Sequence, residues 1–120
     1  MSLSKEQVKA YLIRDKGFLK ELYESPNELT RKRSLKNADD MKLNTLIKYL
    51  HFIANGEIKI KAENFKIIRE SNKLKLITKT VEQKAKVLRL LKSARANKLQ
   101  FLIKLNPILP PLLFALFNEQ

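Results

Sequence analysis

Apolar residues recur every three or four positions along most of this chain, and that spacing constrains the fold more than any other feature. In the segment 40–54, one such stripe consists of Leu43, Leu46, Ile47, Leu50, Ile53 and Ala54. A period near 3.6 residues places a stripe on one face of an α-helix, where it is buried against neighbouring helices. The sequence therefore predicts an all-α protein, a single domain of about five or six short helices.

Helix start and stop signals divide the first half of the chain. Ser4 begins a capping box, and Gly17 is expected to weaken or split the helix that follows. Ser25-Pro26 is expected to start the next helix, with serine as the N-cap and proline at the first helical position. The helix over 40–54 is expected to end at Asn55-Gly56, a pair that is typical of a left-handed C-terminal cap.

The second half of the chain is expected to continue as helices. The alternating run 57–61 is interpreted as an extended connector whose two isoleucines, Ile58 and Ile60, fill the core. Helices are expected over 62–71 and 74–92, then from Ser93 or Asn97 to Asn106, and from Pro110 to about Phe117. The residue before a proline is pushed out of helical space, which is why Asn106-Pro107 is expected to end its helix.

Positive charge is concentrated where the apolar periodicity is strongest. Lys and Arg total 25 against 12 Asp and Glu, a formal net charge of +13. Residues 1–40 carry 9 positive and 7 negative side chains, whereas residues 41–104 carry 16 positive and 4 negative, a net +12. We therefore divide the single domain 1–120 into near-neutral N-terminal helices (1–40), a basic helical body (41–104) and an apolar Pro/Leu tail (105–120). A basic body of this kind needs a polyanion or dense counterions.

Two groups of cations are candidates for phosphate contact. The helix over 74–92 carries four Lys or Arg side chains and one Glu at spacings of three and four, so that they share a face about 20 Å long. The other group is the run Arg31-Lys32-Arg33, with Lys36 one turn on. An ordinary solvated face is the alternative for both groups, and a localisation signal is a further alternative for the run. The candidate nucleic-acid-binding residues are Arg31, Lys32, Arg33, Lys75, Lys79, Lys86, Arg89, Lys92 and Arg95.

The sequence carries no catalytic or metal-binding signature. There is no Cys, and His51 is the only histidine, with no acidic residue at a matching helical offset. There is also no Gly-rich phosphate loop and no Ser/His/Asp set with supporting context. We therefore expect a non-enzymatic protein without cofactor, metal or small-molecule substrate, located in the nucleus or cytoplasm.

The apolar tail and the aromatic residues are expected to serve packing. Residues 101–117 carry one charge, Lys104, and are interrupted by three prolines, whereas a membrane-spanning helix needs about 20 apolar residues. The tail is therefore expected to pack within the fold or against a second copy in a homo-oligomer, with membrane contact as the weaker alternative. Most aromatic residues lie on apolar stripes, but Phe52 lies off the stripe of its helix and is a candidate interface residue.

A longer pattern runs from Leu35 to Phe117. It contains the turn Asn55-Gly56-Glu57-Ile58, a Lys-rich pair of helices and the proline-leucine tail at 107–113. In this pattern the chain resembles small basic helical proteins of Maverick/Polinton-type elements and adenovirus-like animal viruses. The resemblance implies a virion- or element-encoded protein near a packaged genome, and it carries over no residue roles.

Our hypothesis from the sequence is a sequence-independent nucleic-acid-binding protein that contacts backbone phosphates, because nothing marks a base-reading element. If about six phosphates are neutralised, the logarithm of affinity should fall against the logarithm of salt concentration with a slope of about −5. One alternative is an oligomeric interaction module that uses the apolar tail and meets an acidic protein. Another is a basic protein that binds an anionic membrane surface. The sequence does not decide whether the ligand is DNA or RNA, or whether it is single-stranded or double-stranded.

Overall fold

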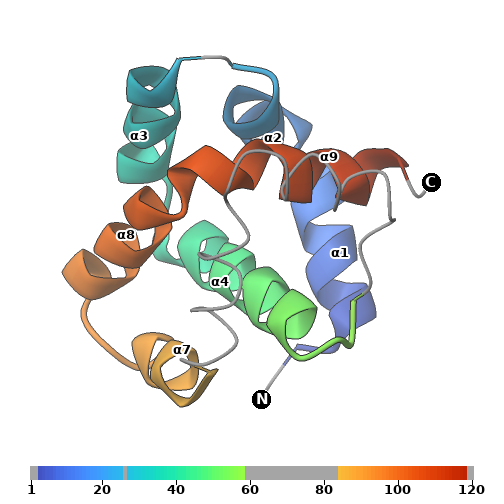
Figure 1. Cartoon of the computed structure of the whole chain (residues 1–120), viewed down its shortest axis with the longest axis vertical. Coiled ribbons are helices and arrows are strands. Elements are labelled where there is room, and N and C mark those ends of the chain that lie inside the picture. The colour runs from blue at the N-terminus through green and yellow to red at the C-terminus, as the bar shows by residue number, and fades with distance from the viewer. Residues whose placement is uncertain (1–2, 26, 59–83, 119–120) are drawn as a thin grey trace.

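Helices account for every regular element among residues 3–25, 27–58 and 84–118, which are the residues that the computed structural model describes. They are α1 (Lys5–Arg14), α2 (Lys16–Tyr23), α3 (Glu28–Asn37), α4 (Asp40–Ala54), α7 (Lys84–Leu90), α8 (Arg95–Lys104), the short 3-10 helix η1 (Asn106–Ile108) and α9 (Leu109–Asn118) (Figure 1). The all-α prediction is confirmed. The helix expected over 62–71, the first part of the one expected over 74–92, and Ile60 lie outside the described residues.

The central element is α4, which packs against α1 on one side and against α7 and α8 on the other (Figure 1). Its apolar stripe is buried as the spacing predicts, and Leu43, Leu46 and Ile47 have no exposed surface. Tyr49 of the same helix is buried too, and its hydroxyl donates a hydrogen bond of 2.9 Å to the carbonyl of Leu112. That bond ties α4 to α9 at the C-terminal end of the described chain.

The first helix begins as predicted but ends at a different residue. The capping box is present, because Ser4 Oγ accepts from the Gln7 amide at 3.2 Å and Gln7 Oε1 accepts from the Ser4 amide at 2.8 Å. The break that was expected at Gly17 lies at Asp15 instead. The carboxylate of Asp15 accepts from the Phe18 amide at 3.3 Å, so this residue ends α1 and also caps α2.

The predicted start of α3 is wrong by two positions. Asn27, not Ser25, is the N-cap, and its Oδ1 accepts from the Leu29 amide at 2.8 Å. The hydroxyl of Ser25 instead accepts from the amide of Asn27 at 3.3 Å. Asparagine and serine are both strong N-cap residues, so the sequence alone does not choose between them.

The bounds of α4 and its C-terminal cap follow the prediction. Asp39 caps its start by accepting from the Lys42 amide at 2.8 Å. At its other end Gly56 has a φ of +78°, the left-handed conformation that only glycine adopts at low cost. The amide of Gly56 bonds to the carbonyl of Ile53, and the amide of Glu57 to that of Phe52, which is a Schellman motif. The next residue, Ile58, is buried as expected.

The turn before α8 differs from the prediction. Neither Ser93 nor Asn97 caps this helix, because its N-cap is Ala94, which makes no side-chain hydrogen bond. The hydroxyl of Ser93 instead donates to the carbonyl of Leu90 at 3.0 Å, at the end of α7. Ser93 lies between the end of α7 and the start of α8, and both helix ends have backbone groups without a partner inside the helix. Its hydroxyl bonds to a carbonyl of α7 rather than to an amide of α8.

The apolar tail lies within the fold. α8 ends at Lys104, before Asn106-Pro107, and α9 follows η1 without interruption. Pro110 and Pro111 lie in the first turn of α9, where the backbone N–H groups have no partner inside the helix. Leucines of the tail are buried against the rest of the chain, namely Leu105, Leu109, Leu112, Leu113 and Leu116. These side chains are therefore already covered without a second subunit. In the described ranges, no helix has both the length and the apolar character needed to cross a membrane.

Candidate nucleic-acid interface

The candidate phosphate contacts fall into three classes in the structure. Lys75 and Lys79 lie outside the described residues, and Lys86 lies in α7 with a side chain that is not described. Arg33, Arg89 and Lys92 are exposed, and Lys32 is half-buried. The other two candidates, Arg31 and Arg95, are engaged by groups of the protein itself.

Arg31 is buried, with only 6% of its surface exposed. Its Nε donates to Asn106 Oδ1 at 2.6 Å, and its Nη1 donates to the carbonyl of Ser25 at 2.6 Å. The amide of Asn106 in turn donates to the carbonyl of Glu28 at 3.2 Å. The guanidinium group therefore locks the start of α3 to the corner between α8 and η1. Unlike the exposed candidates, Arg31 therefore has its Nε and Nη1 donors directed to oxygens inside the protein rather than to solvent.

The reason lies in the geometry of the helix. Consecutive residues in an α-helix point about 100° apart, so three adjacent cations cannot share one face. Arg31 lies on the same side of α3 as Leu35, which has no exposed surface, whereas Arg33 points to solvent. The dense run in the sequence is therefore divided between the interior and the surface.

Arg95, the first residue of α8, bridges two other elements. Its Nη1 forms a 3.0 Å ion pair with Asp40 Oδ1, and its Nη2 donates to the carbonyl of Lys36 at 2.7 Å. The ion pair is at the surface, since the side chains of Arg95 and Asp40 are 38% and 66% exposed. Its structural effect is to hold the end of α3 beside the start of α8.

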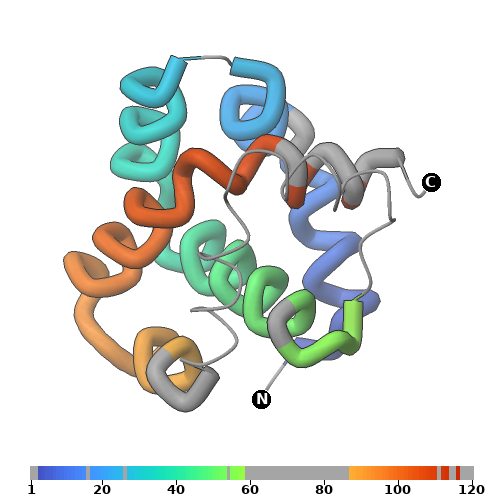
Figure 2. The backbone as a smooth tube through the Cα atoms, viewed as in Figure 1, coloured from blue at the N-terminus to red at the C-terminus, as the bar shows by residue number. Residues whose placement is uncertain are grey.

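This bridge places the end of α3, which carries one basic group, beside the start of α8, which follows α7 in the chain. The ends of α3 and α7 flank α8, and the three helices follow one another along one side of the molecule (Figure 2). We call the exposed and half-exposed cations of α3, of α7 and of the turn after α7 the basic edge; its members are Lys32, Arg33, Lys36, Arg89 and Lys92. Lys36 and Arg95 are 59 positions apart in the chain, so no local pattern predicts that they meet.

Acidic side chains are absent from the part of the chain that forms α7 and α8. Residues 84–104 contain seven Lys or Arg and no Asp or Glu. One cation of this segment is not at the surface, because Lys98 is buried with 7% of its surface exposed. The positive charge that α7 and α8 present to solvent is therefore opposed, among the described ion pairs, by Asp40 alone.

A second ion pair lies at the junction of α1 and α2. Lys42 Nζ is 2.9 Å from Asp15 Oδ2 and 5.5 Å from the centre of the Phe18 ring. The hydrogen bond from Lys42 lowers the pKa of Asp15 below its usual value and raises the pKa of Lys42. This cation is used to hold α4 against the N-terminal helices.

No family model, curated protein or solved structure matches this chain. The resemblance to proteins of Maverick/Polinton-type elements therefore stays a prediction. Within the described part of the chain, no three His, Asp or Glu side chains lie close enough together to hold a metal ion. The lone histidine, His51, is buried in α4 beside Asn55, whose Nδ2 is 3.0 Å from His51 Nε2.

Proposed function

We propose that the protein binds nucleic acid through backbone phosphates and without sequence preference, using the basic edge. The observation that carries the proposal is the bridge at Arg95, which holds the end of α3, with its cations, beside the start of α8. Cations that line one side of a protein bind a polyanion more strongly than the same number scattered over its surface, because their fields add. Such binding would suit a protein that is encoded by a virus or mobile element and lies near the packaged genome.

The members of the basic edge have the chemistry that phosphate contact requires. The guanidinium groups of Arg33 and Arg89 can each bind two phosphate oxygens, and the lysines act as point charges. Phosphate contacts position a protein on nucleic acid but carry no sequence information. Arg95 would act by positioning, because its own donors are directed to Asp40 and to the carbonyl of Lys36.

The first prediction concerns salt and charge reversal. If all five members of the basic edge contact phosphates, the logarithm of the association constant should fall against the logarithm of salt with a slope of about −4.5. Replacing Arg89→Glu and Lys92→Glu together should weaken binding to duplex DNA at low salt by more than tenfold and make the slope shallower by about 2. Fluorescence anisotropy across a salt series measures both quantities.

A matched control separates position from net charge. Arg14→Glu together with Lys20→Glu changes the net charge by the same amount, but these exposed residues lie on α1 and α2. The control variant should retain most of the affinity and most of the salt slope. Equal losses in the two variants would mean that only overall charge matters, and the basic edge would then have no special role.

A further inference from the structure

Two consecutive helices, α7 and α8, are joined by the short turn 91–94, and both pack against α4 (Figure 1). Backbone hydrogen bonds close this turn, because the amide of Leu91 bonds to the carbonyl of Val87 and that of Ser93 to the carbonyl of Leu90. Two helices joined by a turn of about three or four residues form a helix-turn-helix arrangement. In that arrangement the second helix can lie in the major groove of DNA.

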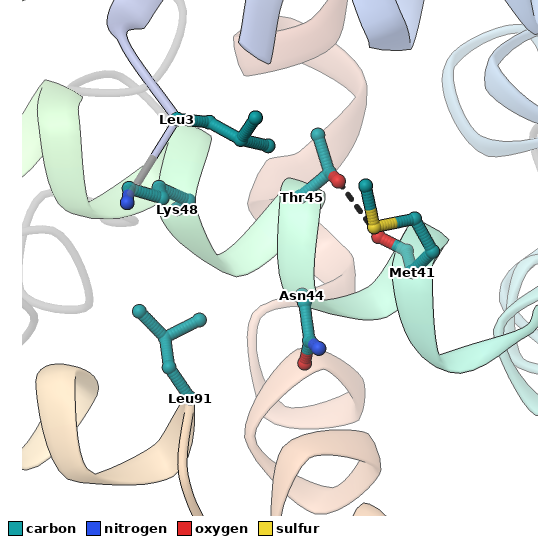
Figure 3. A pocket seen from close by; sticks show the side chains of 6 residues that line it. All are labelled: Leu3, Met41, Asn44, Thr45, Lys48 and Leu91. Carbon is teal, nitrogen blue, oxygen red and sulfur yellow. Dashed lines mark hydrogen bonds between the residues drawn. The ribbon is translucent and has the colours of Figure 1, made fainter. Parts of the chain in front are cut away.

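The turn is attached to α4 through Leu91. This side chain is half-buried and packs against the core. Figure 3 shows it directed towards α4, where Asn44 and Lys48 line the same pocket. Val87, in α7, has no exposed surface. The position of α8 is therefore set by the packing of the fold and does not wait for a ligand.

One face of α8 is exposed along the whole length of the helix. Its members are Ala96, Asn97, Gln100 and Lys104. With 3.6 residues per turn, these four side chains lie within an arc of about 100°. The opposite face is buried at Lys98 and Leu102. The exposed face thus carries short or flexible polar side chains, and none of its four members is acidic or a large apolar residue.

The charge around this face suits DNA. Lys92 lies three positions before α8, and the end of α3, with the exposed Lys36, lies beside the start of α8. Lys104 supplies a cation at the other end of the helix. Among the described contacts, the carboxylate that reaches α8 is that of Asp40, and it is paired with Arg95. Phosphates on the rim of a groove would therefore meet cations at both ends of the face.

The two amides of this face match the floor of the major groove. The side chains of Asn97 and Gln100 each carry two N–H donors, and within the described part of the chain neither has a hydrogen-bond partner. Every base pair contains one purine, and its N7 is an acceptor in the major groove for adenine and guanine alike. Donation to N7 is therefore open to any sequence, in agreement with binding that has no sequence preference.

We propose that α8 lies in the major groove of duplex DNA, where Asn97 and Gln100 donate to purine N7 atoms. The inference rests on the proposed function, since the basic edge supplies the phosphate contacts, and it narrows the ligand class to B-form double-stranded DNA. The major groove of B-form DNA is about 12 Å wide and admits an α-helix. That of an A-form RNA duplex is too deep and narrow for side chains to read, and a single strand has no such groove.

The direct test compares four ligands of equal length by fluorescence anisotropy. They are a DNA duplex, the same duplex with 7-deazapurines in place of its purines, an RNA duplex and a single DNA strand. The 7-deazapurine duplex keeps the phosphates and the base pairs but has no N7 acceptor. The unmodified DNA duplex should bind at least about threefold more tightly than the 7-deazapurine duplex, and more tightly than the RNA duplex and the single strand.

Three results of this comparison would overturn the inference. The first is equal affinity for the two DNA duplexes, which would show that N7 is not contacted. The second is binding of the RNA duplex as tightly as the DNA duplex. The third is binding of the single strand as tightly as the DNA duplex.

Variants of α8 provide a second test. Asn97→Ala together with Gln100→Ala removes both amides without changing charge, at exposed positions where alanine favours the helix. This variant should no longer distinguish the unmodified duplex from the 7-deazapurine duplex. The matched control, Asn37→Ala, removes an exposed amide at the end of α3 and should keep the distinction. Thermal melting by circular dichroism verifies folding, and the comparison of ligands on the unaltered protein needs no variant.

The two proposals fail in different ways. If no ligand binds with a salt-dependent affinity, the proposed function falls and the inference falls with it. If Arg89→Glu with Lys92→Glu weakens binding but the two DNA duplexes bind equally, phosphate contact stands and the placement of α8 in the major groove is wrong.

Discussion

At the scale of single residues, the environment of a side chain decides its role more than its neighbours in the sequence do. Arg31, Lys32 and Arg33 are identical in charge and adjacent in the chain, yet one is buried, one is half-buried and one is exposed. The buried member is satisfied by oxygens from two other segments, at Asn106 and Ser25. A cation is removed from water only where such acceptors replace its hydration.

Replacing Arg31 should therefore cost stability rather than binding. In Arg31→Met the oxygen of Asn106 and the carbonyl of Ser25 lose their donor, and we expect the free energy of unfolding to fall by about 2–3 kcal/mol. Arg33→Met, two positions on at an exposed site, should change it by less than about 0.5 kcal/mol. Urea unfolding followed by circular dichroism measures both. Equal stability of the two variants would contradict a locking role for Arg31.

At the scale of elements, apolar periodicity predicts which segments are helical, but the residues at the junctions decide where each helix begins and ends. Periodicity and the C-terminal cap predict the course of α4 over 40–54, because the apolar stripe and the Asn55-Gly56 pair agree there, and the structure adds the N-cap at Asp39. They misplace the break between α1 and α2. Asp15 ends α1 and also caps α2, and no sequence pattern indicates that one residue serves both helices. They also misplace the start of α3, where Ser25 and Asn27 compete for one cap.

Asp15 also makes the α1–α2 junction sensitive to acid. Its pKa lies below the usual value of 3.8 because of the hydrogen bond from Lys42, so the ionised form stabilises the fold at pH values above 3.8. That contribution should be lost as the pH falls below 3.8 and through the folded-state pKa. In Asp15→Asn, which keeps an oxygen for the Phe18 amide but has no charge, stability should fall less steeply between pH 5 and pH 2. Urea unfolding at several pH values measures the slopes.

A second substitution at the same residue separates the cap from the charge. Asp15→Ala removes both, and at pH 7 it should be less stable than Asp15→Asn by about 1 kcal/mol, the usual contribution of an N-cap. Identical acid slopes for the unaltered protein and Asp15→Asn would show that the ion pair with Lys42 contributes nothing to the pH dependence.

The two glycines should respond to alanine with opposite signs. A Cβ atom would meet nothing within 4 Å at either Gly17 or Gly56, so packing does not distinguish them. Gly56 has a positive φ, and Gly56→Ala should destabilise the protein by about 1 kcal/mol. Gly17 lies in α2, and Gly17→Ala should stabilise it by about 0.5 kcal/mol. Thermal melting of both variants gives the signs, and a stabilising Gly56→Ala would contradict the assigned turn.

At the scale of the whole molecule, the fold class can be predicted from this sequence but the arrangement of its charge cannot. Helical spacing is a local property, and it gives the buried stripe of α4 and the buried leucines of the tail correctly. The basic edge depends on contacts between distant segments, chiefly that of Arg95 with Lys36. The sequence correctly marks Arg89 and Lys92 as exposed cations, but it does not indicate that the end of α3 lies beside α8.

The partner of Arg31 has a consequence for the order in which the protein is made. Asn106 lies 75 positions after Arg31, so a ribosome has synthesised most of the chain before the acceptor exists. Until then the Arg31 guanidinium group of the emerging polypeptide lacks its Asn106 acceptor, at a position that is buried in the folded protein. We expect the N-terminal helices to reach their mature packing only after residue 106 has left the ribosome, so a premature stop before residue 106 should be damaging far upstream of the lost segment.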